Sequence, residues 1–73
     1  MSRIANTIGE RAYNHGYAFA TAKYKKNRTE IGNQFDEMMA IVTELMFSGC
    51  LSDDERDYIS DQYQKGLDDG NNA

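Results

Sequence analysis

Small and apolar side chains recur along this chain with the period of an α-helix. In residues 3–26 the small residues fall three or four positions apart, so they lie on one narrow stripe of a helix. They are Ala5, Gly9, Ala12, Gly16 and Ala20. A glycine inside a helix costs about 0.5 to 1 kcal/mol relative to alanine, and close packing against another helix would explain two of them. A poorly formed first helix is the alternative.

A second helix is predicted over residues 28–48. Asn27 followed by Glu30 has the spacing of a capping box, which places the start of this helix directly after Asn27. A seven-residue rhythm of apolar residues nevertheless runs from Tyr13 to Leu45 across that position, and a single continuous helix would produce the same rhythm. The chain is therefore expected to be all-α, either a small three-helix domain or a long helical hairpin, with the break at Asn27 slightly favoured.

The third predicted helix, residues 53–67, has the clearest start. Gly49 suits the left-handed conformation that ends a helix, and Leu51 can fold back on the preceding turn. Ser52 and Glu55 form a capping box before an amphipathic stripe. We expect this helix to begin at Asp53.

Residues 68–73 lack an apolar period and are predicted to form a tail after this helix. Residues 1–73 as a whole are expected to fold as one helical domain. The absence of proline and of β-branched runs agrees with helices throughout.

The small size of the chain limits its core. A domain of roughly 60 residues buries only about 60% of the surface that its unfolded chain exposes, and such domains usually gain stability from disulfides, metals or a partner. Cys50 and His15 are the only residues of their types, which excludes an intrachain disulfide and a Cys/His zinc site. We expect no cofactor and no metal, and a homo-oligomer or a protein partner in their place.

Residues 38–47 are apolar nearly all round the helix, and such a helix must be covered on most sides. These residues are either the central helix of the fold or a face for self-association or partner binding. The predicted interface consists of Phe35, Met38, Met39, Val42, Leu45, Met46 and Phe47. The methionines would add flexible surface that adapts to another protein.

Charge is sorted along the chain. Residues 1–28 hold six basic and one acidic side chain, whereas residues 29–73 hold two basic and eleven acidic ones. The acidic partner-facing set is Asp53, Asp54, Asp57 and Asp61, and the basic set that could contact phosphate is Lys23, Tyr24, Lys25, Lys26 and Arg28. A solvated end of the first helix, where cations stabilise the carboxyl terminus, explains the basic set without a ligand.

Catalysis has little support in the sequence, since no nucleophile, phosphate-binding glycine loop or metal-ligand pair accompanies His15. We expect a non-enzymatic protein of the cytoplasm, with no membrane segment. The leading hypothesis is a protein-binding module, an adaptor or inhibitor of the kind that phages and mobile elements use to block host enzymes. The alternative is a nucleic-acid or nucleotide-binding protein that uses the basic set.

Overall fold

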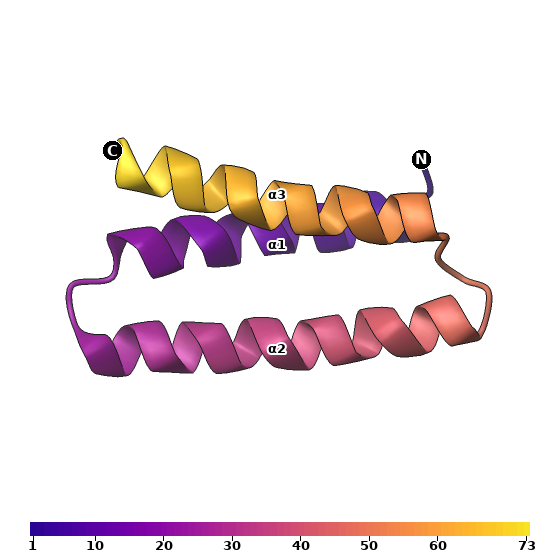
Figure 1. Ribbon diagram of the computed structural model, residues 1–73, viewed down its shortest axis with the longest axis horizontal. Coiled ribbons are helices and arrows are strands. Elements are labelled where there is room, and N and C mark those ends of the chain that lie inside the picture. Colours follow the sequence, from indigo (N-terminus) through magenta and orange to yellow (C-terminus); the bar gives the residue numbers. More distant parts are fainter.

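The protein is a bundle of three α-helices. The computed structural model describes all 73 residues and contains α1 (Arg3–Thr21), α2 (Lys25–Phe47) and α3 (Asp53–Asn71), without strands. The chain runs up, down and up again, so α1 and α3 are parallel and α2 is antiparallel to both (Figure 1). This confirms the prediction of an all-α fold and selects the three-helix domain over the long hairpin.

Glycines let α1 and α3 meet backbone to backbone. A Cβ atom on Gly16 would overlap the carbonyl oxygen of Tyr63, and one on Gly66 would overlap the carbonyl oxygen of Tyr13. Only glycine permits so close an approach of two backbones. The predicted small-residue stripe of the first helix is therefore the surface that packs on α3, and its members Ala5, Gly9, Ala12 and Gly16 are buried.

The break between the first two helices lies at residues 22–24, earlier than the predicted break at Asn27. Asn27 sits inside the first turn of α2, since the Arg28 N–H donates to the carbonyl of Tyr24. Tyr24 occupies the cap position without a side-chain hydrogen bond. The Arg28 guanidinium instead donates to the carbonyl oxygen of Ala22 at 3.2 Å and closes the connection.

The connection between α2 and α3 follows the prediction. Gly49 has a φ of 81°, which favours glycine, and the Leu51 side chain is buried. Ser52 and Glu55 form the predicted reciprocal capping box, and α3 begins at Asp53.

The predicted tail is largely helical. α3 continues through Asn71, and Gly70 is buried. A Cβ atom at Gly70 would lie 2.7 Å from Cβ of Ala20 and 3.0 Å from the carbonyl oxygen of Tyr17. Packing against α1 thus holds the last turn in a helix that its own sequence favours only weakly.

The hydrophobic core is small. Nine residues are buried, and only Ala5, Ala12, Val42, Leu51 and Ile59 among them are hydrophobic. Val42 is the one buried residue of α2, which reaches the other helices through side chains. The ring of Phe35 on α2 stacks on Tyr63 of α3 with centroids 3.8 Å apart. α2 is therefore joined to the α1–α3 pair by a thin layer of side chains.

Glu55 ties the starts of α1 and α3 together. Its carboxylate accepts from the Ser2 hydroxyl at 2.5 Å and from the Ser2 N–H at 3.1 Å, while also accepting from Ser52 in the capping box. The Ser2 hydroxyl and the backbone N–H groups of Ser52 and Ser2 lower the pKa of Glu55 to about 2.

Candidate functional site

The predicted interface of α2 divides between the core and the surface. Val42 is fully buried, and five of the other members pack partly buried against the core. Those five are Phe35, Met38, Met39, Leu45 and Met46. Phe47, the last residue of α2, stands apart because 88% of it is exposed. Much of the apolar surface of α2 is thus used inside the fold, and Phe47 is the most exposed member of the predicted set.

Two isoleucines outside the predicted set are also exposed. Ile41 on α2 is 56% exposed, and Ile4 on α1 is 45% exposed. Ile4 repeats with Ile8 and Ala18 on one face of α1, at spacings of four and ten residues. That period is visible in the sequence and could have identified this second apolar face.

The predicted acidic residues lie on the exposed side of α3. Asp53, Asp54, Asp57 and Asp61 are all exposed. Asp57 is 3.4 Å from the guanidinium of Arg56, in an exposed ion pair that contributes little to stability. It is the only ion pair in the chain.

The predicted basic residues lie at the other end of the bundle. Lys23, Tyr24, Lys25, Lys26 and Arg28 are all exposed and belong to the α1–α2 connection and the first turn of α2. Figure 1 places this connection at the end opposite the start of α3, and the carboxyl end of α3 lies at the same end of the bundle as the connection. The basic set is therefore separated from Asp53 and Asp54 at the start of α3, and no basic residue of this set pairs with an acid.

The position of these cations differs from the prediction in one respect. Cations were expected to stabilise the carboxyl terminus of the first helix, but Lys25, Lys26 and Arg28 follow that helix and open α2. The amino terminus of a helix carries partial positive charge, so cations there are unfavourable. Helix stability does not account for them.

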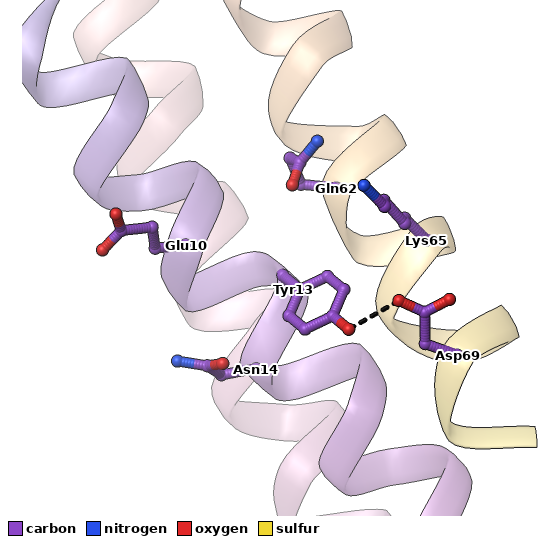
Figure 2. Close-up of a pocket in the computed structure, with 6 residues that line it drawn as sticks. All are labelled: Glu10, Tyr13, Asn14, Gln62, Lys65 and Asp69. Atoms are coloured by element: carbon purple, nitrogen blue, oxygen red, sulfur yellow. Dashed lines mark hydrogen bonds between the residues drawn. The ribbon is translucent and has the colours of Figure 1, made fainter. Parts of the chain in front are cut away.

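A shallow polar hollow lies between α1 and α3, on the residues shown in Figure 2. It has a volume of about 420 Å³ and is lined by Glu10, Tyr13, Asn14, Gln62, Lys65 and Asp69. The Tyr13 hydroxyl donates to Asp69 at 2.6 Å across the two helices. This hydrogen bond, together with desolvation and the charge of Asp69, raises the pKa of Tyr13. Five of its six lining residues are polar or charged, and Tyr13 is the one hydrophobic residue among them.

The single histidine and the single cysteine lie apart from this hollow. His15 is half-buried on α1, and its Nδ1 donates to the carbonyl oxygen of Arg11 at 2.7 Å. Cys50 is exposed in the connection before α3. No group of three or more acidic, histidine or cysteine side chains is arranged to hold a metal ion.

Comparison of this chain with protein families, with curated proteins and with solved structures found no match. None of the three helices combines the length and the apolar character that crossing a membrane requires.

Proposed function

We propose that this protein is a non-enzymatic protein-binding module that acts by occupying a surface of a larger protein. The observation that carries the proposal is Phe47, a large aromatic side chain that is 88% exposed at the end of a helix. Aromatic side chains are enriched at the energetic centre of protein interfaces. Met46 lies half-buried beside it and can adapt its shape to a partner.

The acidic residues indicate the chemistry of that partner. α2 ends and α3 begins at the same end of the bundle (Figure 1), so Phe47 shares this end with Asp53 and Asp54. A partner surface with an apolar pocket and a cationic rim would complement this arrangement. Action as an inhibitor, of the kind encoded by phages and mobile elements, is the specific form we propose, because a small acidic binder acts by covering another protein's surface.

Photo-crosslinking tests this function directly. A photoreactive amino acid at Phe47 is expected to capture one protein from a lysate of the source organism, whereas the same group at the exposed Gln64 of α3 should not capture it. The captured protein should then bind the purified module, and Phe47→Asp should weaken that binding at least tenfold. Equal capture from both positions would contradict the proposal.

Nucleic-acid binding is the second candidate, favoured by the cations that open α2 against the helix dipole. Tyr24 is 70% exposed among them and could stack on a base. The exposed lysines Lys23, Lys25 and Lys26 are free of ion pairs and could contact phosphates.

Salt dependence tests this candidate. Binding to a labelled single-stranded oligonucleotide should weaken with a log–log salt slope of about −2, since three to four released counterions give roughly −0.7 each. Alanine at Lys23, Lys25 and Lys26 should abolish binding, and Lys65→Ala on α3 should leave it unchanged. Absence of binding at low salt in a fluorescence anisotropy titration would exclude this function.

A further inference from the structure

A hollow of about 190 Å³ lies between α1 and α2, lined by Asn14, His15 and Ala18 of α1 and by Ile31 and Gln34 of α2. This hollow fixes the register of the two antiparallel helices. Residues near 15–18 of α1 lie level with residues near 31–34 of α2.

The faces of α1 and α2 that line this hollow continue toward the start of α1, and we term the strip between these two faces the groove. On α1, Ile8 and Ile4 lie on the face that lines the hollow, toward the amino terminus of the helix. On α2, Met38 and Ile41 lie on the corresponding face, toward the carboxyl terminus of that helix. Because the helices are antiparallel, these two rows lie side by side. Ile4 and Ile41 leave about half of their surface exposed, so this part of the groove is apolar and uncovered.

Opposite charges border the groove. Glu30, Glu37 and Glu44 recur every seven residues along the edge of α2 next to Ile41, and all three are exposed. Arg11 lies on the α1 side, level with residues near Glu37. Neither Arg11 nor Glu37 takes part in an ion pair within the chain.

We propose that a second copy of this chain covers the groove in a two-fold symmetric dimer, with α2 of each copy lying antiparallel across α1 of the other. A two-fold axis parallel to the helices keeps every residue at its own level, so Glu37 of one copy meets Arg11 of the second copy. An axis across the helices would place the glutamate rows of the two copies against each other. Charge complementarity selects the first arrangement.

The dimensions of the molecule fit this dimer. A specific interface buries roughly 800 Å² on each partner. The molecule measures 38 × 21 × 15 Å, so its broad face can supply that area when the dimer uses nearly the full length of both helices. The apolar centre of the interface would consist of Ile4, Ile8, Met38, Ile41 and Leu45 from each copy.

The dimer is independent of the proposed function. Phe47 follows Ile41 by six positions, which places the two side chains about 120° apart around α2. Phe47 therefore stays outside the groove and remains free for a different partner. A failure to dimerise would leave the crosslinking result at Phe47 unaffected, and the reverse also holds.

Charge reversal tests the dimer and its orientation. Sedimentation equilibrium at low salt should give the wild-type protein twice the 8.3 kDa of one chain. Arg11→Glu and Glu37→Arg should each weaken dimerisation at least tenfold, because each places like charges together twice in the symmetric interface. An equimolar mixture of the two variants should dimerise again. In the mixed dimer one contact is the native Arg11–Glu37 pair, and the other pairs the new glutamate at position 11 with the new arginine at position 37.

Asp61→Arg on the exposed side of α3 is the matched control and should leave the mass unchanged, and far-UV circular dichroism should report a helical fold for every variant. A wild-type protein that stays at 8.3 kDa up to millimolar concentration would overturn the proposal. A mixture of the two variants that remains monomeric would overturn it as well.

Discussion

Gly16→Ala and Gly66→Ala are each expected to destabilise the protein by about 2 kcal/mol or more, whereas Gly32→Ala is expected to stabilise it. Alanine is the better helix former by up to about 1 kcal/mol at all three positions. At Gly16 and Gly66, however, the new methyl group would overlap backbone carbonyl oxygens of the opposite helix. Backbone cannot move aside like a flexible side chain, so α1 and α3 must separate, and overpacking of this kind typically costs 1–3 kcal/mol or more.

Gly32 provides the matched control because it differs only in its surroundings. A Cβ atom there would lie 3.8 Å from the ring of Phe19, an ordinary contact. Thermal and urea unfolding followed by far-UV circular dichroism measure all three variants. For a chain of this length 1 kcal/mol corresponds to roughly 4–8 °C in Tm, so the variants should separate clearly. A rise in Tm for Gly16→Ala similar to that for Gly32→Ala would show that the two backbones are not in contact.

The α1–α3 contact also shows what the sequence could and could not predict. The stripe from Ala5 to Ala20 indicated close packing because its period is local. The opposite surface on α3 was not recognised, although Gly66 and Gly70 stand four residues apart, because residues 68–73 lack an apolar period and Gly70 was therefore placed outside the predicted helix. Contact with α1 keeps the last turn of α3 helical. Such a contact between segments distant in the sequence leaves no pattern in the local sequence.

The two capping boxes make the same point. Ser52 and Glu55 adopt the predicted arrangement because Gly49 ends the preceding helix and leaves Ser52 free to cap. Asn27 has the same spacing to Glu30 but lies within α2, since the chain already turns at residues 22–24. A capping motif thus permits a helix start and requires an independent break just before it.

The orientation of α2 could not be predicted, because a helix that is apolar nearly all round has no single apolar face. Sequence alone placed Met38, Val42 and Phe47 together in one interface. In the fold Val42 is buried, Met38 is half-buried and Phe47 is exposed. The distinction between core and binding surface therefore depends on how α2 is rotated about its axis, and adjacent residues can test that rotation.

Val42→Asp is expected to destabilise the protein strongly, whereas Ile41→Asp is expected to leave its stability nearly unchanged. Val42 is fully buried, and an aspartate there would place an unpaired carboxylate in the thin layer that joins α2 to the other helices. An uncompensated buried charge costs about 3–5 kcal/mol, which is a large part of the roughly 4–11 kcal/mol expected for a domain of this size. Ile41 is 56% exposed, and substitutions at such positions usually change stability by about 0.5 kcal/mol or less.

Circular dichroism and sedimentation equilibrium on the same samples separate the two roles of α2. Val42→Asp should unfold at a much lower temperature and urea concentration than the wild-type protein, by an amount that corresponds to about 3–5 kcal/mol. Ile41→Asp should unfold close to the wild-type midpoint, and its mass should fall to that of one chain, because its carboxylate enters the proposed dimer groove and leaves the core untouched. Equal destabilisation of both variants would show that α2 buries Ile41 as well as Val42, and that this helix is rotated toward Ile41 by part of the roughly 100° step between adjacent residues.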